Sequence, residues 1–201
     1  MLAISHKHRL IFMHIPKTAG TSIVSLLKEL DKDLFVRMGH PLANEWKQFR
    51  EEDYRDYRWF TVCRNPYDRL VSAFFYIKNS GQNKNDKLLR DSFGLADVEF
   101  AEFVRNFDLR LLQSRPRHFV RQAEFIEGRK DKISSVLRYE NLQSDLDTLF
   151  SEFGLPETRL PYKNRSERSG FSDYYGEAER RKIQQIYQLD FDVFGYETRL
   201  C

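Results

Sequence analysis

Short apolar runs alternate along the chain with longer segments in which apolar residues recur every three or four positions. The short runs are typical of buried strands, and they comprise residues 10–15, 34–38, 58–63 and 133–138. The periodic segments predict amphipathic helices, and they comprise residues 21–30, 66–78, 97–107, 142–153 and 176–189. Strands that alternate with helices pair in parallel through right-handed crossovers. The pattern therefore predicts an α/β fold with a central parallel sheet.

Two polar segments interrupt this pattern. Residues 79–91 are rich in Asn and Lys around Gly81, and they predict a mobile loop that can line a site. Residues 155–175 lack a helical period and predict irregular structure. A chain of 201 residues without an internal repeat fits one domain, so we expect a single domain over residues 1–201.

The first predicted strand leads through a tight turn into the first predicted helix. Helix N-termini bind anions because their first N–H groups have no partner and carry partial positive charge. Lys17 adds a full charge, and Gly20 lets the backbone approach a ligand. The side chains of Thr18, Thr21 and Ser22 add hydroxyl donors. This arrangement predicts a phosphate-binding loop, whereas His14, inside the strand, is expected to be a packed core residue.

The turn differs from the loop that binds nucleoside triphosphates. That loop has the pattern G-x-x-x-x-G-K-[ST], with the lysine directly after the second glycine. Here Lys17 precedes the single glycine, Gly20. A kinase or nucleotide phosphotransferase remains an alternative, although neither its lysine nor an acidic Mg²⁺ ligand is evident in the sequence.

A second candidate phosphate contact follows the predicted strand at residues 58–63. Arg64 stands at the end of that strand, and a guanidinium can fork two N–H donors onto a phosphate. Ser72 lies two turns into the next helix and can donate to the same oxygens. Lys17, His40 and Arg64 each follow a predicted strand, and ligands of parallel sheets bind at that edge. We therefore expect these three residues on one rim of the sheet.

Composition and charge exclude several classes of protein. The net charge is only +3 among 31% charged residues, which does not favour nucleic-acid binding. Two cysteines, Cys63 and Cys201, form no disulfide framework and suit a reducing compartment. No clustered Cys and His predict a metal site, and no apolar run is long enough for a membrane span. We expect a soluble, cytoplasmic protein without a catalytic metal.

Two motifs resemble those of sulfotransferases, which use 3′-phosphoadenosine 5′-phosphosulfate (PAPS). The stretch Pro-Lys-Thr-Ala-Gly-Thr-Ser at residues 16–22 resembles the 5′-phosphosulfate loop of that family. The stretch Arg-Asn-Pro-Tyr-Asp-Arg-Leu-Val-Ser at residues 64–72 is similar to the family's 3′-phosphate motif, and the two occur in the family's order. The resemblance implies a P-loop-like three-layer sandwich with a central parallel sheet flanked by helices. It also implies that residues 17–22, including Ala19, bind the nucleotide together with Arg64 and Ser72.

Later stretches extend the resemblance to carbohydrate sulfotransferases of the heparan sulfate 2-O-sulfotransferase type. His40 stands where those enzymes have their catalytic histidine. His118-x-x-x-Gln122 is similar to a family stretch that implies substrate contacts from His118, Arg121 and Gln122, with His118 as the runner-up base. Asn164-Arg-Ser166 matches a closing motif, which implies that Asn164 and Ser166 touch the nucleotide.

The expected function is transfer of the sulfuryl group from PAPS to a hydroxyl, with 3′-phosphoadenosine 5′-phosphate (PAP) as product. The acceptor implied is a carbohydrate or another hydroxylated small molecule. Lys17 would neutralise charge on the leaving phosphate oxygen. His40 would accept the proton of the hydroxyl, because an ordinary imidazole pKa near 6.5 suits a base at neutral pH. A non-catalytic nucleotide-binding domain is the remaining alternative.

Overall fold

The computed structural model describes residues 1–37, 39, 42, 50–79, 83–108, 116–161 and 170–199. The chain forms two compact units. The first unit comprises Met1–Arg64 and Gln122–Arg165, and the second comprises Asn65–Arg121 and Ser166–Cys201. This division does not test the expectation of a single domain, which stays a prediction.

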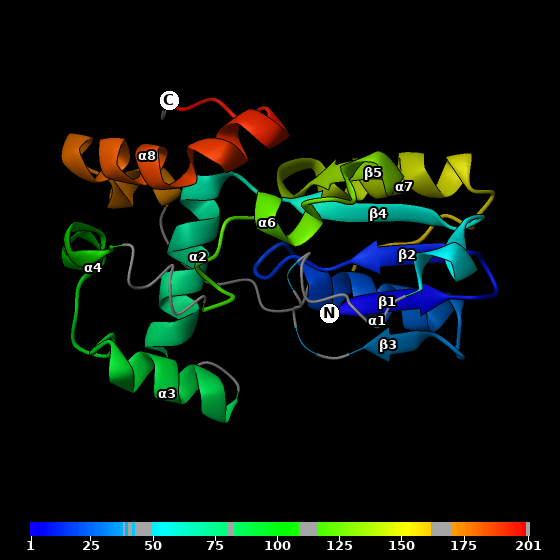
Figure 1. The fold of residues 1–201 in the computed structure, drawn as a ribbon, viewed down its shortest axis with the longest axis horizontal. Coiled ribbons are helices and arrows are strands. Elements are labelled where there is room, and N and C mark those ends of the chain that lie inside the picture. The colour runs from blue at the N-terminus through cyan, green and yellow to red at the C-terminus, as the bar shows by residue number, and fades with distance from the viewer. Residues whose placement is uncertain are drawn as a thin grey trace. The chain divides into compact units, whose positions relative to one another are not determined.

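The first unit contains the sheet, in which five strands of the described residues lie side by side (Figure 1). In chain order they are β1 (Leu2–Ser5), β2 (Leu10–Met13), β3 (Phe35–Arg37), β4 (Arg58–Cys63) and β5 (Ile133–Arg138). The spatial order is β3-β1-β2-β4-β5. Strands β2, β4 and β5 pair in parallel, which confirms the predicted central parallel sheet.

Strand β1 was not predicted, because the run Leu2–Ser5 is too short to stand out beside the polar turn that follows it. It pairs antiparallel with both β2 and β3. Because β2 and β3 are both antiparallel to β1, they run in the same direction. The carboxyl ends of β2, β3, β4 and β5 therefore share one edge of the sheet, as predicted for the rim.

Helices α1 (Gly20–Leu30) and α7 (Leu142–Glu152) cover one face of this sheet. Their leucines pack with Phe12, Phe60 and Leu137 of the strands. All residues of β1 and β2 are buried, so both faces of these central strands are covered. The first unit also contains α6 (Ala123–Ile126) and three short 3-10 helices, η2 (Glu51–Tyr54), η3 (Lys130–Lys132) and η4 (Tyr139–Asn141).

The second unit is helical in its described part and has an aromatic core. It contains α2 (Pro66–Lys78), α3 (Lys84–Ser92), α4 (Phe100–Asn106), η5 (Phe171–Tyr174) and α8 (Glu177–Phe194). Fully buried Phe74, Phe107 and Phe119 pack with Tyr187 of α8. Helix α2 has the predicted start, with Pro66 at its first position and the Asn65 side chain accepting a hydrogen bond from the Tyr67 N–H.

Two predictions for the second unit need correction. The segment at residues 79–91 was predicted as a mobile loop, but helix α3 occupies Lys84–Ser92. Its only buried residue is the polar Asp86, so the apolar spacing that signals a helix is missing. Helix α8 continues to Phe194, beyond the predicted end at residue 189, because Phe191 and Phe194 are also buried.

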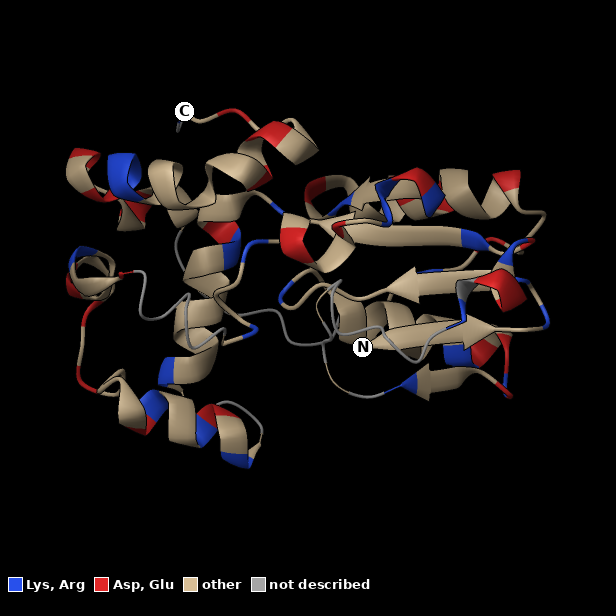
Figure 2. Cartoon of the chain, viewed as in Figure 1, with Lys and Arg blue, Asp and Glu red and all other residues tan. Residues whose placement is uncertain are grey.

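Charged residues of both signs are scattered over the helices and turns, and the strands carry them only near their ends (Figure 2). No helix in the described part of the chain is long and apolar enough to cross a membrane.

Candidate phosphate-binding site

The loop between β2 and α1 has a strained backbone. Lys17 and Ala19 have φ angles of 71° and 64°, in the left-handed region that non-glycine residues seldom occupy. Each costs about 1–2 kcal/mol, and such strain is concentrated at functional sites. Left-handed residues that alternate with right-handed ones turn successive N–H groups toward one point and form an anion-binding nest. The backbone around Thr18 therefore has the shape expected of a phosphate loop.

Helix α1 begins directly at this nest. The carbonyl of Ala19 accepts from the N–H groups of Ser22 at 3.0 Å and Ile23 at 3.1 Å. The amides of Gly20 and Thr21 precede these bonds, in the turn where helical N–H groups have no partner within the helix. The first turn carries no acidic side chain. The positive end of the helix dipole thus adds to the nest.

The predicted hydroxyl donors differ in their exposure. Thr21 is exposed and Ser22 is buried at 4% exposure. Thr18 is fully buried, and its hydroxyl donates to the carbonyl of Ile15 at 2.8 Å. A hydroxyl has one hydrogen, so the backbone amide of Thr18, and not its side chain, is left to donate to an anion. Its side chain instead holds the turn together.

Gly20 has a steric role that the sequence did not show. A β-carbon at this position would lie 1.8 Å from Cδ2 of His14. The His14 ring is buried, as predicted, and stacks on Phe12 with ring centroids 5.8 Å apart. Glycine therefore allows the start of α1 to lie directly against the imidazole.

Arg64, at the end of β4, reaches the loop. Its Nη1 donates to the carbonyl of Lys17 at 3.1 Å, and its guanidinium lies 3.8 Å from the ring centroid of Tyr139. The residue is only 6% exposed. The structure thus brings together two of the predicted site residues, Lys17 and Arg64, at the carboxyl edge of the sheet.

Gln122 lies behind Arg64 and is fully buried. Its Oε1 accepts from the Arg64 N–H at 3.0 Å, and its Nε2 donates to the Arg64 carbonyl at 2.8 Å. The sequence predicted a substrate contact for Gln122. Its side-chain amide binds the main chain of another predicted site residue, and the substrate contact stays a prediction.

The other described candidates belong to the second unit. Ser72 is half-buried on α2, and its predicted partnership with Arg64 stays a prediction. Arg121 donates from Nε to the carbonyl of Ile186 at 2.8 Å. This bond lies beside Tyr187, where the backbone of α8 departs from helical angles. Arg121 therefore has a structural contact whether or not it binds substrate.

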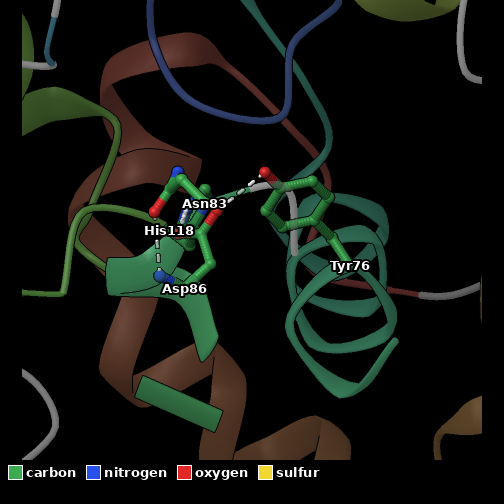
Figure 3. A network of polar contacts seen from close by, with 4 residues as sticks. All are labelled: Tyr76, Asn83, Asp86 and His118. Carbon is green, nitrogen blue, oxygen red and sulfur yellow. Dashed lines mark hydrogen bonds and ion pairs between the residues drawn. The ribbon is translucent and has the colours of Figure 1, made fainter. Parts of the chain in front are cut away.

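His118 belongs to a polar network around the buried carboxylate of Asp86 (Figure 3). Its Nε2 lies 3.0 Å from Oδ1 of Asp86, while Tyr76 and Asn83 each donate to Oδ2 at 2.8 Å. An ionised carboxylate only accepts, so Nε2 carries a ring hydrogen. His118 Nδ1 is buried and has no hydrogen-bond partner in the described part of the chain. The network fixes the orientation of the imidazole.

Three predicted site residues, His40, Asn164 and Ser166, lie outside the described residues. Within the described ranges, no group of His, Cys, Asp or Glu residues could hold a metal ion. Sequence reasoning missed Tyr139 and Asp86. Tyr139 directly follows β5, at a position that no pattern in the sequence analysis marks, and Asp86 lay in the segment predicted as a loop.

Comparison with known proteins agrees with this arrangement. The model of the sulfotransferase family matches residues 1–197. Carbohydrate sulfotransferase 10 of Xenopus laevis is 24% identical over 96% of this chain, and its mouse counterpart is 21% identical over 96%. Carbohydrate sulfotransferase 12 of Xenopus laevis is 21% identical over 97%.

This chain spans 60–66% of the length of these three relatives. No solved structure matches the chain. The family model covers nearly every residue, including both predicted phosphate motifs, and the chain belongs to the sulfotransferase family.

Proposed function

We propose that the protein transfers a sulfuryl group from PAPS to a hydroxyl of a carbohydrate or glycosylated acceptor. The family match and the carbohydrate sulfotransferases among its relatives support this proposal. The loop conformation supports it independently, because left-handed Lys17 and Ala19 at a helix N-terminus form an anion nest. This strained loop is the observation on which the proposal chiefly rests.

The residues of the loop would act mainly by position and charge. PAPS supplies an activated sulfuryl group when bound. Lys17 and the amides of residues 18–22 would bind the 5′-phosphate, whose oxygen gains charge as its bond to sulfur breaks. Arg64 would select nucleotides with a 3′-phosphate, together with Ser72. Asn164 and Ser166 would add contacts to the nucleotide.

A base must take the proton of the acceptor hydroxyl as its oxygen bonds to sulfur. We assign this role to His40, with His118 as the alternative. The contact with Asp86 favours a fixed orientation of His118 and suits either a base or an acceptor contact. A cytoplasmic location also stays a prediction.

The first experiment is thermal unfolding with PAP, ATP or ADP, each with and without Mg²⁺. PAP should stabilise the protein without metal, because Lys17 and Arg64 supply the positive charge. Stabilisation by ATP only in the presence of Mg²⁺ would instead favour a kinase. Transfer of labelled sulfate from PAPS to a panel of sugars and glycolipids then separates an enzyme from a binding domain.

Two variants assign the roles. Lys17→Ala should lower the rate of sulfuryl transfer by at least about a hundredfold, since it removes the positive charge that neutralises the leaving oxygen. Lys28→Ala, on the exposed last turn of the same helix, is the matched control and should retain activity.

His40→Ala should bind PAP normally and lose transfer, and unchanged turnover would exclude His40 as the base.

A further inference from the structure

The side-chain amide of Gln122 pairs with both main-chain groups of Arg64. The two bonds, 3.0 Å to the N–H and 2.8 Å to the carbonyl, fix the amide in one orientation because only one end can donate. Gln122 is fully buried, so no water replaces either bond if it is lost. The pair thus sets the backbone direction at Arg64, directly after β4 ends.

The Arg64 side chain is restrained by two further contacts. Its Nη1 donates to the Lys17 carbonyl at 3.1 Å, and its Cζ lies over the Tyr139 ring, 3.8 Å from the ring centroid. A directional hydrogen bond and a cation–π contact with a ring restrain different motions of the guanidinium. Lys17, Arg64 and Tyr139 follow the adjacent strands β2, β4 and β5, so one arginine connects three strand ends.

The contact with Lys17 bears directly on the anion nest. A peptide group is planar and trans, so its N–H points opposite to its carbonyl. When Arg64 holds the Lys17 carbonyl, it also fixes the direction of the Thr18 N–H, which belongs to the same peptide. Lys17 is in the strained left-handed conformation, and a charged donor on its carbonyl offsets part of that cost.

We propose that Gln122 is a positioning residue that acts through Arg64 to hold the loop at Lys17 in its anion-binding conformation. Arg64 then serves the 5′-phosphate loop as well as the 3′-phosphate assigned to it above. The nucleotide part of this inference depends on the proposed function, whereas the part about the conformation of the loop does not.

The test compares Gln122→Ala and Gln122→Glu with a matched control, Gln143→Ala. Gln143 lies on α7, and its amide also bridges two main-chain groups, the carbonyl of Thr158 at 3.0 Å and the N–H of Leu160 at 2.9 Å. The control therefore removes the same kind of contact from the same unit without touching Arg64. Binding of PAP and of adenosine 5′-monophosphate is measured well below the unfolding temperature.

Gln122→Ala should lower the affinity for both nucleotides by about tenfold, the effect of losing one or two buried hydrogen bonds. Gln122→Glu should lower both affinities further, because an ionised carboxylate would face the Arg64 carbonyl. Gln143→Ala should leave both affinities within about twofold of the wild type. Loss of affinity for PAP alone would overturn the proposal, since an effect limited to the 3′-phosphate does not pass through the loop.

Hydrogen exchange of the amides at residues 17–22 tests the conformation without any nucleotide. Exchange should accelerate in both Gln122 variants and in Arg64→Lys, which keeps the charge but loses the planar fork, and not in Gln143→Ala. Exchange rates equal to those of the control would overturn the inference. Failure of the wild-type protein to bind either nucleotide would instead contradict the proposed function, while the exchange result still decides the role of Gln122.

Discussion

The contact between Gly20 and His14 shows how much one residue can constrain the candidate site. Gly20 begins α1 with an ordinary φ angle, so its backbone would tolerate a side chain. The obstacle is the buried imidazole of His14, which lies where the β-carbon would be. The sequence indicated why a glycine would help a ligand approach, but not this steric need, because positions 14 and 20 meet only in the folded chain.

We predict that Gly20→Ala lowers the free energy of unfolding by about 1–3 kcal/mol, the usual cost of overpacking. When His14 is already alanine, Gly20→Ala should cause no further loss. The double variant should be at least as stable as His14→Ala alone, since alanine has a higher helix propensity than glycine. Urea unfolding of the four proteins measures the coupling. Additive effects of the two substitutions would contradict a direct contact between these residues.

At the scale of elements, α3 depends on polar contacts more than on apolar packing. Asp86 is its only buried residue, and it accepts from Asn83, Tyr76 and His118. We predict that Asp86→Ala increases hydrogen exchange throughout residues 84–92 by at least about tenfold, because three side-chain donors lose their buried acceptor. Asp91→Ala, which removes an exposed carboxylate paired with Arg90, is the control and should leave exchange unchanged.

The difference between apolar packing and polar contacts also explains which elements the sequence could predict. Strand β4 and helix α2 have uninterrupted apolar patterns and a proline at the helix start, and their predicted bounds are confirmed. Helix α3 has no apolar pattern, and β1 is only four residues long. The roles of Gln122 and Tyr139 depend on contacts with Arg64, which is distant in sequence, and no local pattern encodes them.

Asp31 joins the end of α1 to β1 in a pH-dependent way. The Ser5 hydroxyl donates to its carboxylate at 2.6 Å, and this bond is the main reason that the pKa of Asp31 is lowered, although burial acts in the opposite direction. A lowered folded pKa adds stability above the unfolded value of about 3.9, and that stability is lost as the pH falls through the folded value.

Ser5→Ala should therefore lower the free energy of unfolding at pH 7, by about 1.5–3 kcal/mol for a hydrogen bond to a charged group. The difference from the wild type should shrink as the pH falls below about 4, because protonated Asp31 no longer benefits as an anion. Ser134→Ala removes a hydroxyl bond to the Trp59 carbonyl, a neutral acceptor, and its deficit should not change with pH. Urea unfolding at pH 7 and pH 3 compares them.

At the scale of the whole molecule, the chain passes between the two compact units after Arg64, after Arg121 and after Arg165. Arg64 and Gln122 therefore mark two of these crossings, and their paired hydrogen bonds hold the two segments side by side within the first unit. Each unit has its own core, one built on the sheet and one on aromatic side chains. The predicted nucleotide contacts are also divided, because the phosphate loop belongs to the first unit and Ser72 to the second.

This division makes the two phosphates separable by mutation. Ser72→Ala should lower the affinity for PAP about tenfold or more, because a hydrogen bond to a charged phosphate is lost. It should leave the affinity for adenosine 5′-monophosphate unchanged. Ser144→Ala on α7 removes a hydroxyl that donates to the Asn141 carbonyl, and it should change neither affinity. Titration calorimetry with both nucleotides measures the effect. If Ser72→Ala weakened the two nucleotides equally, the residue would not discriminate the 3′-phosphate, and nucleotide selection would have to depend on Arg64 without it.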